Sequence, residues 1–261
     1  MQISLSCAEV VFENRPSIPG ILANDEIQIW VIPSFPTMPH QELMELSRNS
    51  GFDALISPED KFSIQKFVLD KGKNRKLMTI LSRKLILADL LGIESSSLVI
   101  EIDIFGKPFL PTFRDVHFNV SHSGEFIVLA VGKVPVGIDL EFLDDYFDFY
   151  DMVGSIFQDT EKDKIKEDDK PVLKFFDFWT RKEAFLKAIG VGFRISPLDI
   201  KVAGKRNVFT LSKIKIDQTG WVCKSGQISP GYFCSLVHPD GVSSMEISIH
   251  YWKKFRNEIN S

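Results

Sequence analysis

The sequence has few cysteines, no long apolar run and no excess of positive charge. Its three cysteines, Cys7, Cys223 and Cys234, are too scattered for a zinc-binding spacing or a disulfide framework. The apolar stretches fall far short of the roughly 20 residues that a membrane-spanning helix needs. The first residues lack a basic segment followed by an apolar run, so we expect no signal peptide. These absences favour a cytoplasmic protein without a membrane partner.

The charge balance argues against a protein that binds nucleic acid. Acidic side chains outnumber basic ones by 35 to 31, which gives a net charge of −4 at pH 7, whereas binding along a phosphate backbone needs a basic field. A local basic pocket for a small phosphate ligand stays compatible with this balance, because such pairing is decided locally. The 261 residues allow one large or two small domains. The 22 phenylalanines predict a core rich in aromatic rings.

The first part of the chain predicts one strand followed by helices. Residues 26–32 partly alternate polar and apolar side chains, which is typical of a strand. We expect a helix over about 40–47 and another that begins at Ser57–Asp60, where a serine N-cap precedes a proline and two acids. Apolar residues recur at helical spacing through 75–91, and Gly92 then ends that helix.

The second part predicts short strands around another long helix. Residues 118–120, 126–131 and 136–141 are expected to form a meander of antiparallel strands, because turn residues separate them. Residues 171–189 predict a long helix. Further strands are expected at 208–214 and 231–237. The sequence therefore predicts an α+β protein in which each half has a long helix and a few strands.

Asp139 and Glu141 are the first candidates for chemistry. In a strand, residues two apart point to the same face, while Ile138 and Leu140 point the other way into a core. Two neighbouring carboxylates repel each other unless a cation lies between them, and Mg²⁺ prefers oxygen ligands. The pair therefore indicates either a metal site or two unrelated acids on an edge strand.

Glu183 and Lys187 lie one turn apart on the helix predicted over 171–189. By themselves they describe either a functional pair or an ordinary surface ion pair, which is worth only a few tenths of a kcal/mol. The nearby Trp179 and Phe185 are expected in the core rather than in a site.

Two short segments are candidates for phosphate binding. Residues 119–124 run from a strand into a glycine turn, where backbone N–H groups and hydroxyls can hold an anion. His122 could add a donor, although a lone histidine is more often structural. Lys107 follows a glycine, but its surroundings are not the phosphate loop of nucleotide hydrolases. No G-x-S-x-G motif surrounds Ser121, so we do not expect a hydrolase nucleophile.

Taken in order, these segments resemble the surfactin-type 4′-phosphopantetheinyl transferases. The resemblance rests on residues 105–111 (FGKPFLP), on 118–124 (FNVSHSG) continuing into 136–141 (VGIDLE), and on 178–187 (FWTRKEAFLK). It implies a magnesium-dependent transferase of the holo-acyl-carrier-protein synthase type. Such an enzyme moves the 4′-phosphopantetheine of coenzyme A to a serine of an apo acyl, peptidyl or polyketide carrier protein.

The resemblance also implies a fold. The chain would form two similar α/β halves related by a pseudo-twofold axis, with the active site in the cleft between them. Residues 1–133 would form the half that contacts the nucleotide of coenzyme A, and residues 134–261 the half that carries the metal and catalytic residues. The protein would act as a monomer.

Individual residues take roles by the same resemblance. Asp139, Glu141 and Glu183 would bind Mg²⁺. Coenzyme A would be bound by Arg75, Lys84 (or its neighbour Arg83), Lys107, Ser121, His122 and Lys187. Glu183, Lys187 and Glu161 would be catalytic, with Glu161 as the base for the carrier serine. Two other readings stay open: a coenzyme A-binding or carrier-docking protein without turnover, and a metal-dependent phosphodiesterase or nuclease.

Overall fold

The structure, a computed structural model, describes residues 22–144, 146–191, 194–202, 210–211, 220–240 and 246–252. The first part of the chain holds β1 (Glu26–Pro33), α1 (His40–Asn49), η2 (Phe52–Leu55), α2 (Pro58–Gln65), α3 (Asp70–Leu91), η3 (Ser95–Ser97), β2 (Glu101–Ile102), β3 (Pro108–Phe109), β4 (His117–Ser123) and β5 (Phe126–Gly132). The second part holds β6 (Gly137–Phe142), α4 (Tyr150–Ile156), α5 (Asp159–Lys166), α6 (Pro171–Ile189), η5 (Pro197–Asp199), β7 (Ile200–Lys201), β8 (Thr210–Leu211), β9 (Trp221–Ser229), β10 (Tyr232–Pro239) and β11 (Glu246–Tyr251).

These elements confirm the expected mixed α+β class. The predicted start of α2 is also confirmed, because Ser57 and Asp60 form a reciprocal capping box ahead of Pro58. Of the strand expected at 208–214, only 210–211 lies within the described residues, and there it is β8. Cys7 and the amino-terminal segment lie outside the described residues. No helix in the described ranges is both long and apolar enough to cross a membrane.

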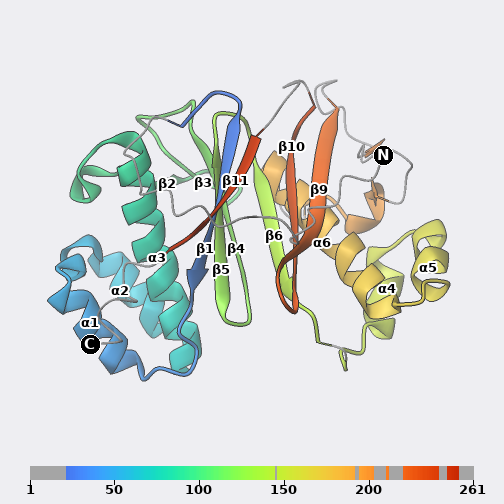
Figure 1. Cartoon of the computed structure of the whole chain (residues 1–261), viewed down its shortest axis with the longest axis horizontal. Helices are drawn as coiled ribbons and strands as arrows, with labels where there is room; N and C mark the ends of the chain where they lie inside the picture. The colour runs from blue at the N-terminus through green and yellow to red at the C-terminus, as the bar shows by residue number, and fades with distance from the viewer. Residues whose placement is uncertain are drawn as a thin grey trace.

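Two sheets lie side by side at the centre of the molecule, with the orders β11-β1-β5-β4 and β6-β10-β9 (Figure 1). The expected meander is correct for β4 and β5, which pair antiparallel. It is wrong for β6, which pairs with β10 instead. The reason is that β5 already pairs with β1 on one side and β4 on the other, so it has no free edge for a third partner.

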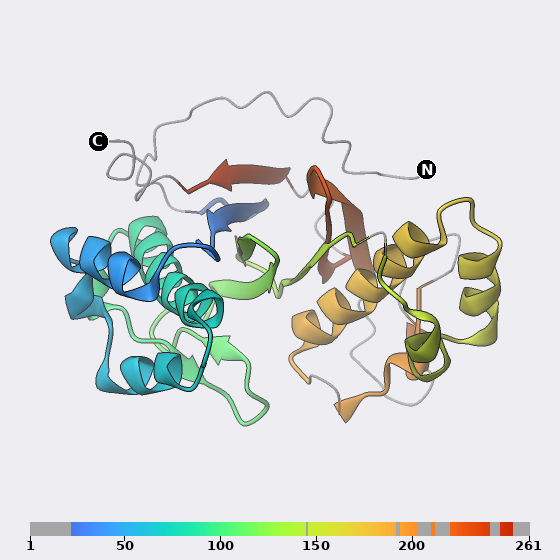
Figure 2. The ribbon, with the colours of Figure 1, turned by 90° about the horizontal axis from the view of Figure 1, so that it is seen from below.

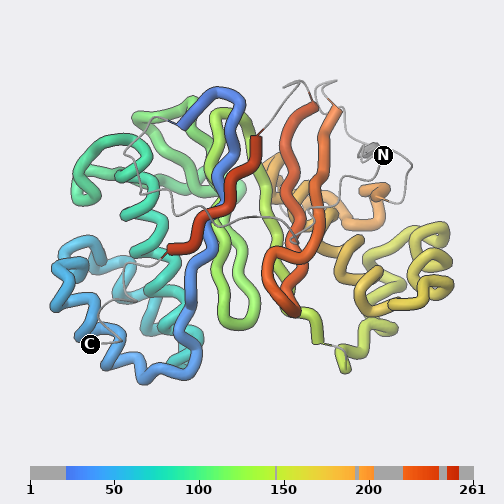
Figure 3. Tube along the Cα trace, in the orientation of Figure 1, coloured from blue at the N-terminus to red at the C-terminus, as the bar shows by residue number. Residues whose placement is uncertain are grey.

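The helices form two groups, α1–α3 beside the first sheet and α4–α6 beside the second (Figure 2). The boundary expected between residues 133 and 134 falls in the connection from β5 to β6. One strand lies across that boundary: β11, near the end of the chain, pairs parallel with β1 of the first sheet (Figure 3). A symmetry axis that relates the two halves stays a prediction.

The core confirms the expected abundance of aromatic rings. The centre of the Phe175 ring lies 4.9 Å from that of Phe149 and 5.5 Å from that of Phe157, in the cluster around α6. Helix α3 buries apolar side chains such as Leu77 and Leu81 against the first sheet. Packing of this kind, rather than local propensity, supplies most of the stability of such helices.

Strand β6 lies directly against α6 because of a glycine. A Cβ added at Gly137 would overlap the backbone of Ala184 and Ala188. On the opposite face of β6, Ile138 and Leu140 are buried among apolar residues of both sheets, as the alternation predicts. Asp139 and Glu141 share the face of Gly137, so the strand turns its two carboxylates toward α6.

Candidate active site

Alternate side chains of β4 join it to the neighbouring β6. Asn119 Oδ1 accepts a hydrogen bond from the backbone of β6 at 2.9 Å. Ser121 Oγ donates to Asp139 Oδ1 at 2.8 Å, and Ser123 Oγ donates to Glu141 Oε2 at 3.0 Å. The segment expected as an anion-binding turn therefore also positions both acids. The period of two in its polar residues was the sequence signal for this role.

Asp139 is buried, with 4% of its surface exposed, and it is only partly satisfied. Its Oδ1 accepts from Ser121 and from Lys187 Nζ at 2.7 Å. Its Oδ2 has no partner among the residues that the structure describes. Burial raises the pKa of Asp139, and the Lys187 ammonium offsets this in part. A buried carboxylate oxygen without a donor calls for a ligand that supplies positive charge.

Glu183 reaches the same place from α6. It is 9% exposed, and its Oε1 has no partner within the described ranges. Burial, followed by the negative charge of Asp139, raises the pKa of Glu183 to about 7, and Glu141 adds to the shift while Lys187 opposes it. The three carboxylates predicted as metal ligands therefore act on one another electrostatically, although they come from two elements.

Glu141 is the most constrained of these carboxylates. Its Oε2 accepts from Ser123, and its Oε1 accepts from Trp179 Nε1 at 3.2 Å. Burial and the charge of Asp139 raise the pKa of Glu141. Trp179 was expected in the core. It is only partly buried, and its indole N–H orients Glu141.

The unpartnered carboxylate oxygens meet part of what Mg²⁺ requires. Within the described part of the chain, no three His, Cys, Asp or Glu side chains are close enough to hold a metal ion by themselves. Mg²⁺ commonly binds through one or two carboxylates and completes its octahedron with water and substrate phosphate oxygens. Asp139 Oδ2 and Glu183 Oε1, both buried and unpartnered, supply such a pair. The residues therefore fit a magnesium ion that is shared with a phosphate ligand.

Positive charge gathers beside the carboxylates. His122 projects from β4, and partial desolvation, followed by the charge of Arg75, lowers its pKa. Lys187 and Lys76 lower it further. The structure therefore brings basic side chains of α3, β4 and α6 close to one another. Such a cluster next to two unpartnered carboxylate oxygens suits a diphosphate ligand.

Comparison with known proteins identifies the family. The model described as "4′-phosphopantetheinyl transferase, N-terminal" matches residues 48–133. The model described as "4′-phosphopantetheinyl transferase superfamily" matches residues 135–236. This chain belongs to the 4′-phosphopantetheinyl transferase superfamily. Both matches meet at the connection between β5 and β6, beside the site.

Individual relatives carry the same name. A 4′-phosphopantetheinyl transferase of Bacillus subtilis is 31% identical over 148 residues, which are 56% of this chain and 65% of the relative. The transferase Sfp of Bacillus subtilis strain 168 is 26% identical over 197 residues, 74% of this chain and 87% of the relative. The transferase gsp of Aneurinibacillus migulanus is 33% identical over 142 residues, 54% and 58% of the two chains. The first and third matches thus span less than two thirds of those relatives.

Lys84 is engaged by the segments that precede α3. Lys84 Nζ donates to the Leu55 carbonyl at 2.6 Å and lies 3.5 Å from Asp60, so it holds α3 to the segment before it. The adjacent Arg83 has a buried Nε without a partner in the described residues, and burial lowers its pKa. Which of the two would contact a nucleotide stays a prediction.

Lys107 also differs from the expectation for a phosphate ligand. Its ammonium donates to the carbonyls of Lys187 and Ala188 at the end of α6. The lysine predicted to bind coenzyme A is therefore engaged with the protein itself.

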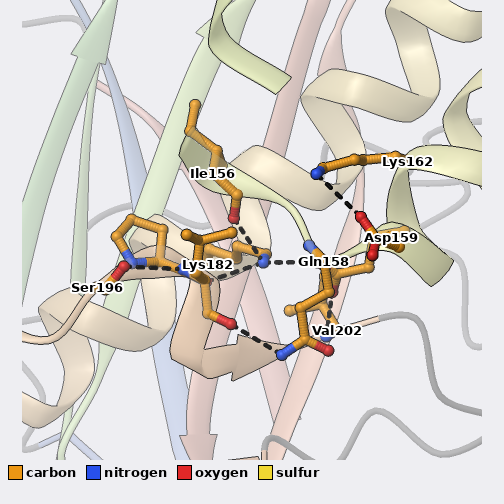
Figure 4. A network of polar contacts seen from close by, with 10 residues as sticks. Ile156, Gln158, Asp159, Lys162, Lys182, Ser196 and Val202 are labelled. Atoms are coloured by element: carbon orange, nitrogen blue, oxygen red, sulfur yellow. Dashed lines mark hydrogen bonds and ion pairs between the residues drawn. The ribbon is translucent and has the colours of Figure 1, made fainter. Parts of the chain in front are cut away.

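Glu161, the predicted base, lies in a buried ion pair. Its side chain is fully buried, and its Oε2 lies 2.7 Å from Lys182 Nζ. Its Oε1 accepts from the Val202 backbone at 2.8 Å. Lys182 Nζ also donates to the Ile156 carbonyl at 3.0 Å (Figure 4). Both oxygens of the Glu161 carboxylate are engaged and none of its surface is exposed, which does not favour a contact with a carrier serine. The assignment of Glu161 as the base stays a prediction.

Proposed function

We propose that this chain transfers the 4′-phosphopantetheine arm of coenzyme A to a serine hydroxyl of an apo carrier protein and releases 3′,5′-ADP, with Mg²⁺ as cofactor. The reaction is of the holo-acyl-carrier-protein synthase type, and the protein acts as a monomer. One observation carries the proposal: two unpartnered carboxylate oxygens, on Asp139 and Glu183, lie beside a cationic cluster in a chain of this superfamily.

The chemistry follows from the charges at the site. The serine oxygen forms a bond to the β-phosphorus of coenzyme A as the bond from that phosphorus to 3′,5′-ADP breaks. Catalysis of such a transfer consists mostly of positioning and charge neutralisation. Bound Mg²⁺ would act as a Lewis acid toward the phosphate oxygens, held by Asp139 and Glu183. Lys187, already fixed by Ser121 and Asp139, neutralises charge on the leaving group.

The serine proton needs an acceptor, and both oxygens of Glu161 are engaged elsewhere. Glu183 has a buried oxygen without a donor at the site itself. Because that oxygen, Oε1, is the one assigned to Mg²⁺, we assign the other oxygen of the Glu183 carboxylate as the group that takes the proton, directly or through a water. His122 and Arg75 would bind phosphate oxygens of coenzyme A.

The reaction class is tested by incubating the purified protein with several apo carrier proteins, coenzyme A and Mg²⁺. Intact mass spectrometry should show the gain of one phosphopantetheine arm on at least one carrier, and chromatography should show an equal amount of 3′,5′-ADP. Tight binding of coenzyme A without any mass gain would instead support a binding protein without turnover. Cleavage of DNA in a parallel assay would support the nuclease reading.

Removal of Mg²⁺ should lower the transfer rate by at least about 100-fold, because a metal supplies several kcal/mol of charge stabilisation at a phosphoryl centre. The rate is measured after treatment with EDTA and again after Mg²⁺ is restored, which should recover it. A rate unaffected by the chelator would count against the metal assignment, provided that metal analysis shows no ion left on the protein.

Replacing Trp179 with phenylalanine should lower kcat about 10-fold, since a hydrogen bond to a charged group contributes roughly 1.5–3 kcal/mol. The ring is kept, but the donor that orients Glu141 is lost. The Mg²⁺ concentration for half-maximal rate should rise in the same assay. Trp30→Phe is a matched control, because it removes a similar 3.2 Å bond to Gln28 within β1, which carries none of the predicted site residues. Equal rates for both variants would contradict this role.

A further inference from the structure

The turn between β2 and β3 is held by hydrogen bonds to Asp103. Asp103 Oδ1 accepts from the backbone N–H groups of Phe105 at 2.8 Å and Lys107 at 2.9 Å. The Asp103 N–H donates to the Lys107 carbonyl at 3.0 Å. Gly106 completes the turn with a φ of 91°, a left-handed value that favours glycine. The backbone of Lys107 is therefore fixed from both its N–H and its carbonyl.

From this turn the Lys107 side chain reaches the end of α6, in the other half of the molecule. Its Nζ lies 2.8 Å from the Lys187 carbonyl and 2.7 Å from the Ala188 carbonyl. These belong to the last four carbonyls of the helix, which have no partner inside it. A cation at this end also interacts favourably with the helix dipole.

Gly190 and Arg194 support the same contact between the β2–β3 turn and the end of α6. Helix α6 ends at Gly190, and a Cβ there would lie 2.9 Å from Lys107 Cδ, so the lysine stem passes over the glycine. Beyond the helix, the Arg194 guanidinium lies 4.6 Å from the centre of the Phe105 ring, which gives the same turn a second contact with the second half. Burial lowers the pKa of Lys107 to about 8, consistent with an ammonium enclosed between the two halves.

We propose that Lys107 is a positioning residue that anchors the last turn of α6 to the first half and thereby fixes Lys187 against Asp139. Lys187 is held twice: Lys107 holds its carbonyl, while its own ammonium donates to Ser121 at 2.9 Å and to Asp139 at 2.7 Å. The catalytic consequence rests on the proposed transferase function, but the anchoring does not. Lys107 accordingly serves the phosphates indirectly, through Lys187.

The test compares Lys107→Met with the wild-type chain. Methionine keeps most of the stem and removes the ammonium, so amide hydrogen exchange should speed up several-fold in the last turn of α6. The kcat for transfer should fall about 10-fold or more, since small misplacements of catalytic groups are costly. The Kd for coenzyme A, from calorimetry, should stay within about twofold of the wild-type value. Lys107→Arg, which can donate to both carbonyls, should restore slow exchange and most of the rate.

Lys133→Met is the matched control, because the Lys133 ammonium pairs with the Asp115 carboxylate at 2.6 Å and not with carbonyls of α6. It should change neither the exchange in α6 nor the rate. Unchanged exchange in Lys107→Met together with a Kd for coenzyme A at least 10-fold weaker would overturn the proposal and make Lys107 a direct phosphate ligand. The exchange measurement needs no turnover. If the protein failed to transfer the arm, the proposed function would be wrong, but the exchange rates would still show whether Lys107 anchors α6.

Discussion

Replacing Asp139 with asparagine, or Glu183 with glutamine, should lower the rate of phosphopantetheine transfer by about 100- to 1000-fold, the loss typical for an essential charge-stabilising group. Each change keeps the shape of the side chain and removes the charge that would bind the metal. Asp139→Asn also removes the charged partner of Lys187. The measurement is single-turnover transfer to an apo carrier at saturating coenzyme A, over a range of Mg²⁺ concentrations.

The fold should survive both changes. Burial raises the pKa of both carboxylates, and the charge of Asp139 raises the pKa of Glu183 further, so their charges do not favour folding. Thermal unfolding by circular dichroism checks this. Asp151→Asn, at an exposed position in α4, should leave both the rate and the stability unchanged. Wild-type transfer by Asp139→Asn would remove the basis of the proposed centre.

Breaking the buried pair of Glu161 and Lys182 should destabilise the protein by about 3–5 kcal/mol, because one charge then stays buried without its partner. Both side chains are fully buried, and Lys182 also donates to the carbonyls of Ile156 and Pro197. Glu161→Gln and Lys182→Met should each show the loss in the free energy of unfolding, measured by urea denaturation. The double variant should lose less than the sum of the two.

This experiment also separates the two roles assigned to Glu161. If Glu161 were the catalytic base, Glu161→Gln would lower the kcat of the enzyme and leave its free energy of unfolding unchanged. The ion pair between Lys162 and Asp159, on the same α5 helix, is the matched control. Its acid is 92% exposed, so Lys162→Met should change stability by less than about 1 kcal/mol. Figure 4 shows Lys182 and the pair of Lys162 and Asp159 in one view.

The local elements could be predicted because their causes are local. The apolar spacing of residues 75–91 predicts a helix, and the structure extends it toward the amino terminus as far as Asp70. The alternation in 136–141 places Ile138 inward and Asp139 outward, as observed. The pairing of β6 could not be predicted in this way, because it depends on which strand edges are free after β1, β4 and β5 have paired.

The candidate site shows the same division. Spacing alone made Asp139 and Glu141 a pair, but it could not bring Glu183, from a separate helix, to the same place. The resemblance to the transferases supplied that grouping, and the structure supports it through the coupled carboxylates. The function of Trp179 was missed because its acceptor, Glu141, lies 38 residues away.

The sequence by itself determined the types of the elements, the faces of the strands and the identities of the charged residues that a phosphate-transferring site requires. The tertiary structure decided which of those charged side chains lie beside the site carboxylates and which bind carbonyls elsewhere. Lys84, Lys107 and Lys182 are chemically alike, yet each donates to carbonyls of other segments, whereas Lys187 points to Asp139. The physical reason is that a lysine is committed by the unpaired acceptors that the fold brings to it, and those acceptors come from distant parts of the chain.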